Sequence, residues 1–248
     1  CLILFCVEEK IPTGRLAELD TKLNGVLKLP FINKRFEGKL NQTLLLNVTK
    51  PMQADHLLLV GLGEGIAVTT DKLRQAAGIA AQLAEKSKFR IISFDIPANN
   101  SSKDLYTRLD KSNDSFPQVV VEGSLLSWYH FDDYKQPTKE RPNRFNQITL
   151  LTQTKSQASS IRSAVSRGQK LATAVATSRD LISQPSNTAT PSYLAKTAKG
   201  LAKSLGMSCK VLTTREMKKL RMGSLLGVSK GSEEPPAFII LEHHGGNK

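Results

Sequence analysis

The first candidate for a chemical role is a serine that lies between two glycines. Gly227, Ser229 and Gly231 match the G-x-S-x-G pattern, in which a strand leads into a nucleophilic serine and a helix follows it. Here two glutamates and two prolines follow the serine, and then comes an apolar run typical of a strand. His243 and His244 are the only histidines downstream, and no Asp lies between the serine and either of them. We interpret the match as a coincidence and not as a catalytic site.

A glycine-rich turn is the second candidate, because such turns can hold a phosphate group. Residues 56–60 form an apolar run typical of a strand, and residues 61–65 follow with glycine at every second position. The dinucleotide-binding fingerprint requires a further glycine three residues after the second one, where this sequence has Ile66. Glu64 would repel a phosphate, and the next helix is expected only from Thr70. The segment is therefore predicted to be a tight structural turn.

The histidines do not form a metal-binding pattern. His243 and His244 stand beside Glu242, but adjacent residues on a strand point to opposite faces of a sheet. A metal site needs three or four convergent ligands, and no other His, Cys or Asp cluster is near them in the sequence. His56 and His130 each stand alone. We interpret all four as ordinary polar residues.

One aromatic cluster lies beside basic residues, as in proteins that bind single-stranded nucleic acid. Its members are Trp128, Tyr129, His130, Phe131 and Tyr134, followed by Lys135, Lys139, Arg141 and Arg144. The simpler interpretation is a helix that buries Trp128 and Phe131, with a solvated basic loop after it. We favour this simpler interpretation.

Short apolar runs predict the strands that must position these residues. They are bounded by polar residues or glycine and cover Leu2–Val7, Thr43–Val48, His56–Val60, Phe89–Ile96 and Gln147–Leu151. Several are apolar throughout, which is typical of a sheet covered on both faces. Helical patterns lie between them, so the fold class is predicted to be α/β.

Two of the expected helices lie in this first part of the chain. Thr70 is expected to cap the first helix, whose apolar side holds Leu73, Ala76, Ala80, Leu83 and Ala84. A shorter helix is expected over about Glu122–Tyr129. The polar segment from Lys135 to Asn146, with two prolines, then separates this helix from the next strand.

The second part of the chain begins with a long helix, expected over about Gln157–Ile182 and ended by Pro185. Its apolar positions are Ile161, Val165, Ala172, Val175 and Ile182. A further helix is expected from Thr190 and Pro191 to Gly206, with a buried stripe of Leu194, Ala198, Leu201 and Leu205. A strand at Cys209–Leu212, a short helix from Thr213 or Thr214 to Leu220 and a strand at Ala237–Leu241 complete the pattern.

The 248 residues carry a net charge of +13, and the charge is uneven. Residues 1–153 hold 20 basic and 17 acidic residues, whereas residues 154–248 hold 15 basic and 5 acidic residues. A basic excess of +10 in the second part is compatible with anionic partners, including nucleic acid. The scarcity of carboxylates argues against a complete carboxylate-based active site there.

Composition also indicates in which compartment the protein resides and whether it spans a membrane. Three cysteines, Cys1, Cys6 and Cys209, are odd in number and far apart, which predicts buried thiols in a reducing compartment. No apolar run approaches the ~20 residues of a membrane-spanning helix. We expect a cytoplasmic protein without membrane contact. Because Cys1 opens within an apparent strand, we expect an N-terminus cut from a longer chain.

Several segments together resemble the leucyl (cytosol) aminopeptidase family. The residues from Arg179 to Pro191 read RDLISQPSNTATP and resemble the family's domain-junction motif. Met222–Ser232, followed by two prolines and Phe238–Leu241, resembles the next block of the family. Upstream, the resemblance is carried by Ala54-Asp55, Gly61–Gly63, Leu73–Gly78 and Phe131–Lys135. The resemblance covers essentially the whole chain in order.

The resemblance implies a macro-like α/β domain over residues 1–153, a linker helix over 154–184 and the beginning of an α/β catalytic domain over 185–248. Members of this family release N-terminal amino acids from peptides with two divalent metal ions, zinc or manganese, and typically form hexamers. The metal-binding motif is expected to follow Gly246, beyond Lys248. We therefore expect no catalytic, cofactor-binding or metal-binding residue in this chain, no bound metal, and no peptidase activity from the chain alone.

Two other classes of function are compatible with the sequence. One is a macro-like module that binds a nucleotide or ADP-ribose, although the incomplete glycine fingerprint at residues 61–65 argues against it. The other is a fragment that binds nucleic acid through its basic second half, which would give affinity that falls steeply with salt.

Overall fold

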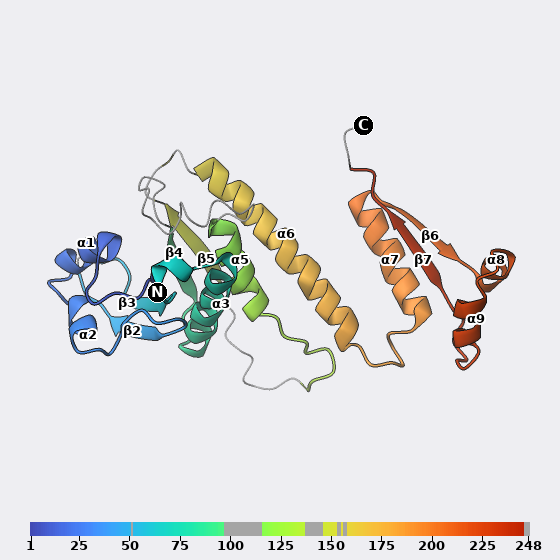
Figure 1. The fold of residues 1–248 in the computed structure, drawn as a ribbon, viewed down its shortest axis with the longest axis horizontal. Coiled ribbons are helices and arrows are strands. Elements are labelled where there is room, and N and C mark those ends of the chain that lie inside the picture. Colours follow the sequence, from blue (N-terminus) through green and yellow to red (C-terminus); the bar gives the residue numbers. More distant parts are fainter. Residues whose placement is uncertain (51, 97–115, 137–145, 153–154, 156–157, 246–248) are drawn as a thin grey trace. The chain divides into compact units, whose positions relative to one another are not determined.

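The computed structural model describes residues 1–50, 52–96, 116–136, 146–152, 155 and 158–245. Contacts between residues divide the chain into two compact units, Cys1–Thr177 and Ser178–Lys248. The division falls within the long helix α6 (Ala158–Ser183), so one helix runs from the first unit into the second (Figure 1).

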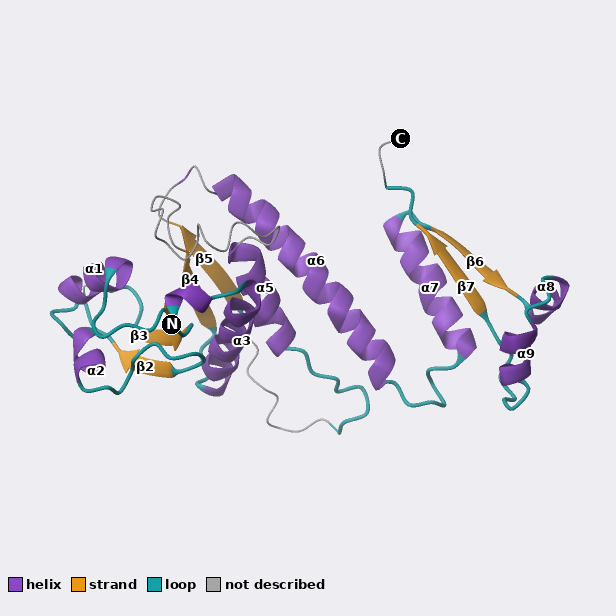
Figure 2. Cartoon of the chain, viewed as in Figure 1, coloured by secondary structure: helices purple, strands orange, loops and turns teal. Residues whose placement is uncertain are grey.

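The first unit is built on a five-stranded sheet with the strand order β2-β3-β1-β4-β5. Figure 2 draws the strands in orange. The strands are β1 (Leu2–Cys6), β2 (Thr43–Asn47), β3 (His56–Gly61), β4 (Ile91–Ile96) and β5 (Gln147–Thr152). Strand β1 pairs in parallel with β3 and with β4, β4 pairs in parallel with β5, and β2 runs antiparallel to β3. All five strands expected in this part of the sequence are confirmed, with bounds that move by one or two residues. The predicted α/β class is confirmed as well.

The two faces of this sheet support two apolar cores. On one face Ile3, Leu58 and Phe94 pack against α3 (Thr70–Lys86) and α5 (Phe116–Ser127). On the other face Leu2 and Leu57 pack with buried residues of α1 (Gly14–Lys22) and α2 (Lys28–Ile32). Because successive side chains of a strand alternate between faces, a strand covered on both sides must be apolar throughout. This explains the uninterrupted apolar runs in the sequence.

Helix α3 forms much as its sequence predicts. The hydroxyl of Thr69 accepts a hydrogen bond from the backbone N–H of Lys72 at 3.2 Å, so the capping residue lies one position before the expected Thr70. The expected apolar side is confirmed, since Leu73, Ala76, Ala80 and Ala84 are buried and Leu83 is half-buried and packs against the core.

Helix α5 begins at Phe116, six residues before the expected start at Glu122, and ends at Ser127. Every residue from Phe116 to Ser124 is buried. A helix buried on all sides carries no polar stripe, and the 3.6-residue pattern that identifies surface helices is therefore absent. The short helices α1 and α2 were also not predicted.

Helices α3 and α5 pack with their backbones in close contact. A Cβ atom on Gly123 of α5 would overlap the carbonyl oxygen of Arg74 on α3. Gly78 faces the carbonyl oxygen of Gly123, which a Cβ would approach to 3.3 Å. Glycine at these positions lets the two backbones approach, and the contact fixes which residues of the two helices lie opposite each other.

The second unit contains a two-stranded antiparallel sheet of β6 (Ser208–Leu212) and β7 (Phe238–Glu242). Helix α7 (Pro191–Leu205) begins and ends as predicted, because Thr190 accepts a hydrogen bond from the N–H of Tyr193 and Gly206 adopts a φ of +66°. Helix α8 (Thr214–Lys219) has a capping box formed by Thr213 and Glu216. Helix α9 (Gly223–Ser229) was not predicted.

The predicted buried face of α7 is partly wrong. Ala195, Ala198 and Ala202 are buried, whereas Leu194, Leu201 and Leu205 are exposed. The small alanine side chains form the buried face, and this places the leucines beside it. The apolar positions Val175 and Ile182 of α6 are exposed as well.

The glycine contact between α3 and α5 can be tested by adding one methyl group. We expect Gly123→Ala to lower the free energy of unfolding by about 1–3 kcal/mol, because the added Cβ forces two packed helices apart. Gly200→Ala in α7 is the matched control, since its Cβ would meet nothing within 4 Å and should be neutral or stabilise the helix. Urea unfolding followed by circular dichroism measures both, and an equal effect of the two substitutions would contradict the close-contact explanation.

Candidate functional site

The glycine-rich segment after β3 uses its backbone amides within the protein. The N–H groups of Gly61, Leu62 and Gly63 donate to the carbonyl oxygens of Gln42, Cys6 and Gly38 at 2.8–2.9 Å. These bonds tie the segment to the end of β1 and to the loop that precedes β2. The same three amides are not available to a phosphate group, which the alternative of a nucleotide-binding module would require.

The loop before β2 explains why glycine is needed here. A Cβ on Gly61 would overlap the carbonyl oxygen of Lys39, and a Cβ on Gly38 would overlap that of Val7. Gly38 and Gly63 also have φ values of +79° and +75°, which residues with a side chain rarely adopt. The glycines therefore serve close packing and backbone conformation at the ends of β1 and β3.

Ser229 does not occupy a nucleophile turn. It is the last residue of α9, and its hydroxyl donates to the carbonyl oxygen of Leu226 at 2.9 Å. A serine nucleophile of the G-x-S-x-G type stands between a strand and a following helix, and neither condition is met at this position. The backbone therefore gives no support for a serine hydrolase.

The described residues do not fit the two-metal centre that the resemblance implies. Among them there is no group of three or more His, Cys, Asp or Glu side chains that could hold a metal ion. His243 and His244 follow β7 directly, His130 is exposed, and the ring of His56 lies 4.6 Å from that of Phe89.

The cysteines are three free thiols. Cys6 is buried in β1, whereas Cys1 and Cys209 are half-buried, so the expectation of buried thiols is correct for one of the three. Burial raises the pKa of Cys6 to about 12, and the carboxylate of Glu9 acts in the same direction. This thiol therefore stays protonated and unreactive at neutral pH.

The aromatic cluster begins where α5 ends. Trp128 is half-buried and packs against the core, and the ring of Phe131 lies 5.9 Å from that of Tyr134. The expected helix over both aromatic residues is wrong, because α5 ends at Ser127. Lys135 forms an ion pair with Asp132 at 2.9 Å. Lys139, Arg141 and Arg144 lie outside the described residues.

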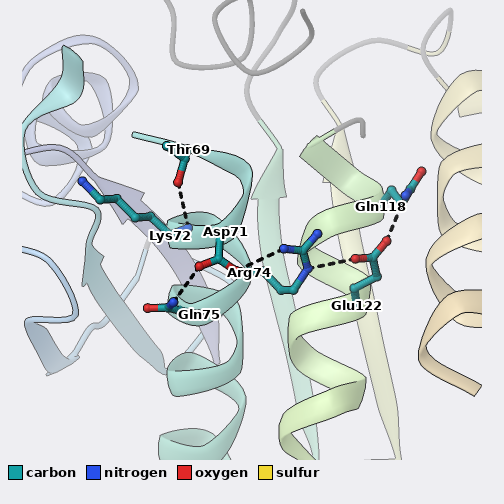
Figure 3. Close-up of polar contacts among 7 residues, drawn as sticks. All are labelled: Thr69, Asp71, Lys72, Arg74, Gln75, Gln118 and Glu122. Carbon is teal, nitrogen blue, oxygen red and sulfur yellow. Dashed lines mark hydrogen bonds and ion pairs between the residues drawn. The ribbon is translucent and has the colours of Figure 1, made fainter. Parts of the chain in front are cut away.

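A buried polar network connects three helices of the first unit, and Figure 3 shows its contacts on α3 and α5. The Nε of Arg74 on α3 lies 2.9 Å from the carboxylate of Glu122 on α5. The side-chain amide of Gln118 donates to the other oxygen of that carboxylate at 2.9 Å, and Arg167 of α6 donates to the Gln118 carbonyl at 3.1 Å. Both oxygens of the buried carboxylate thus have a partner, as burial of a charge demands.

Little in the sequence indicates this network. Arg74 and Glu122 are 48 positions apart, and Arg167 and Gln118 are 49 apart, so no local spacing relates them. The only available signal was a glutamate at the end of the apolar run Val119–Val121. A charged residue in a buried helix needs a partner, but its identity follows only from the fold.

Cavities lie in the described part of the first unit, and two of them are relevant here. One, of about 680 Å³, is lined by both acidic and basic side chains, among them Glu8, Lys10 and Glu37. The other, of about 400 Å³, lies between β5, α5 and α6 and is mostly apolar. The helices in the described part of the chain lack the combination of length and apolar composition that a membrane-spanning helix requires.

The first unit is a mostly parallel α/β domain, and a second unit follows it in the chain. Comparison with known families identifies the class of protein to which they belong. Residues 3–138 match the N-terminal domain of the cytosol aminopeptidase family, and residues 176–248 match the catalytic domain of the same family. This chain belongs to the cytosol aminopeptidase family. The resemblance noted from the sequence motifs is thereby confirmed.

Individual relatives agree with this assignment. A probable cytosol aminopeptidase of Geotalea uraniireducens is 36% identical over 247 residues, which are 100% of this chain and 48% of the relative. A probable cytosol aminopeptidase of Nostoc punctiforme is 33% identical over 231 residues, covering 93% of this chain and 44% of the relative. The chain therefore spans about half the length of the curated relatives it matches.

Solved structures share the fold. A mutant of tomato leucine aminopeptidase superposes with a TM-score of 0.76 at 23% identity, over 97% of this chain and 47% of that one. The bottromycin maturation enzyme BotP in complex with Mn gives a TM-score of 0.68 at 22% identity, over 97% of this chain and 44% of that one. At these identities the likeness concerns the fold alone.

The buried network provides a matched pair of substitutions, because Arg74 contacts one buried and one exposed carboxylate. The side chain of Glu122 is 7% exposed, whereas that of Asp71, 3.3 Å from Arg74, is 67% exposed. We expect Glu122→Gln to cost about 1–3 kcal/mol of stability, because it removes the buried one of the two carboxylates that pair with a partly buried guanidinium. Asp71→Asn should cost about 0.5 kcal/mol or less.

Urea unfolding followed by the fluorescence of Trp128, the single tryptophan, reports on the unit that contains both sites. The same loss of stability in the two variants would show that burial does not govern the strength of these pairs.

Proposed function

We propose that these residues serve a metal-dependent leucyl aminopeptidase that releases N-terminal amino acids from peptides. In this proposal residues 1–153 are its macro-like N-terminal domain, residues 154–184 a linker helix and residues 185–248 the first part of its catalytic domain. The observation that carries the proposal is that both domains of one peptidase family match this chain, in the family's order, over 3–138 and 176–248.

We propose that the complete enzyme is about as long as the curated relatives and that it binds two divalent metal ions, zinc or manganese. Such metals polarise a scissile carbonyl and activate a water molecule when they are bound. The described residues of this chain offer no site for them, so no metal ligand and no catalytic residue is assigned to any position here. We further propose peptide substrates, a homohexamer and a cytoplasmic location for that enzyme.

The role proposed for the 248 residues is support of the catalytic unit. The first unit has a sheet with apolar cores on both of its faces. The first half of α6 is fixed to it through Arg167, which reaches Gln118, and through Gly168, whose missing Cβ would lie 2.7 Å from the Gln118 backbone oxygen. Through this attachment the first unit can define where the long helix begins.

The chain on its own is expected to lack peptidase activity. Purified protein with manganese or zinc should hydrolyse leucine p-nitroanilide no faster than buffer containing the metal, because the described residues contain no metal-ligand cluster. Release of p-nitroaniline is followed by absorbance. Turnover that copurifies with the chain and disappears with a chelator would overturn the proposal that these residues do not hold the metal ions.

A further inference from the structure

The apolar cavity of the first unit runs along the outer edge of the sheet. Its volume of about 400 Å³ is within the range of small-ligand sites. Its lining includes four consecutive residues of β5, Gln147 to Leu150. Since consecutive residues of a strand point to opposite faces, a cavity that touches all four must follow the edge of the strand, not one face of the sheet.

The edge of β5 has backbone groups to offer. In the described part of the chain, β4 is the only strand paired with β5, and β5 is the last strand in the sheet order. About half of the N–H and C=O groups of such an edge strand point away from its neighbour. The strand contains no Lys and no Pro, which edge strands often use to prevent pairing with another chain.

The cavity along the outer edge of β5 is called the edge groove from here on. Its walls favour a ligand with particular side chains. Val121 and Leu125 of α5 and Ile161 and Val165 of α6 supply apolar surface beside the strand. Arg162 is the one charged residue in the lining, and it is exposed and has no ion pair among the described residues. The groove therefore combines a strand edge that no other described strand pairs with, an apolar wall and a single positive charge.

We propose that the edge groove between β5 and α6 binds a short extended peptide of another protein, with apolar side chains and a C-terminal carboxylate. The peptide adds a strand to β5, because a strand edge that no other described strand pairs with selects an extended chain. Its alternate side chains enter the apolar wall of α5 and α6, and its carboxylate lies near Arg162. The inference does not depend on the proposed peptidase activity.

The direct test uses a fluorescein-labelled peptide, Leu-Thr-Leu-Thr-Val, with either a free C-terminal carboxylate or a C-terminal amide. Anisotropy titration with the full chain should show saturable binding of the carboxylate form. Hydrogen exchange should slow at the amides of residues 147–150, which line the groove, when the peptide is bound. A version of the peptide with N-methylated alternate amides should bind at least about fivefold more weakly, because it loses strand hydrogen bonds.

Two serines on α6 supply a matched pair for locating the site. Ser166 lines the groove and Ser163 does not, and both are exposed on the same helix. Ser166→Trp should weaken binding by about tenfold or more, because its ring occupies the space that the peptide needs. Ser163→Trp should leave binding unchanged. Equal affinity in the two variants, with both still folded by circular dichroism, would overturn the assignment of the groove.

The charge is tested with Arg162→Gln, and Lys170→Gln on the same helix is the control outside the groove. Arg162→Gln should weaken the carboxylate peptide about two- to fivefold, as for an exposed ion pair, and should remove the difference between the carboxylate and amide forms. An unchanged preference for the carboxylate would contradict the role of Arg162. A dimer detected by sedimentation, with residues 147–152 protected in the absence of peptide, would show that a second copy occupies the edge and would overturn the peptide proposal.

Discussion

The close contact between α3 and α5 is the constraint on which the first unit depends. Gly123 lies against the backbone of Arg74, so the two helices cannot slide past each other without a clash or a gap. Both helices cover the same face of the sheet, where small residues such as Ala76 and Ala80 allow α3 to lie close to the strands. Since interiors are densely packed, this contact also determines where every polar group on the two helices must lie.

The ion pair between Arg74 and Glu122 is a consequence of that contact. A buried ion pair adds little net stability, because desolvation of the charges offsets most of their attraction. Its effect is on arrangement, since a register that separated the two charges would leave a carboxylate buried without a partner. Gln118 extends the same network to Arg167, and the first half of α6 is thereby held in one position on α5.

The sequence predicted those parts of the fold that depend on local patterns. Strands such as His56–Gly61 were found because a sheet covered on both faces requires continuous apolar runs. The ends of α7 were found because Thr190, Pro191 and Gly206 act through their own backbone geometry. The family was found from motifs such as Arg179–Pro191, which are specific in order and spacing.

Features that depend on tertiary packing could not be predicted in the same way. The start of α5 was missed because its first turns are buried on every side and show no amphipathic period. The exposed face of α7 was assigned wrongly, since the alanine face and the leucine face are neighbours on one helix and only the packing shows which is buried. The network of Arg74, Glu122 and Gln118 joins distant positions that no local rule relates.

The central claim is that these residues support an aminopeptidase and do not themselves hold its metals. Equilibrium dialysis of the 248-residue chain against manganese measures this directly, without relying on catalysis. The account predicts no saturable binding, with the same metal concentration on both sides of the membrane across the micromolar range. Saturation at one or two manganese ions per chain would contradict it, because the described residues contain no group of His, Cys, Asp or Glu that could hold them.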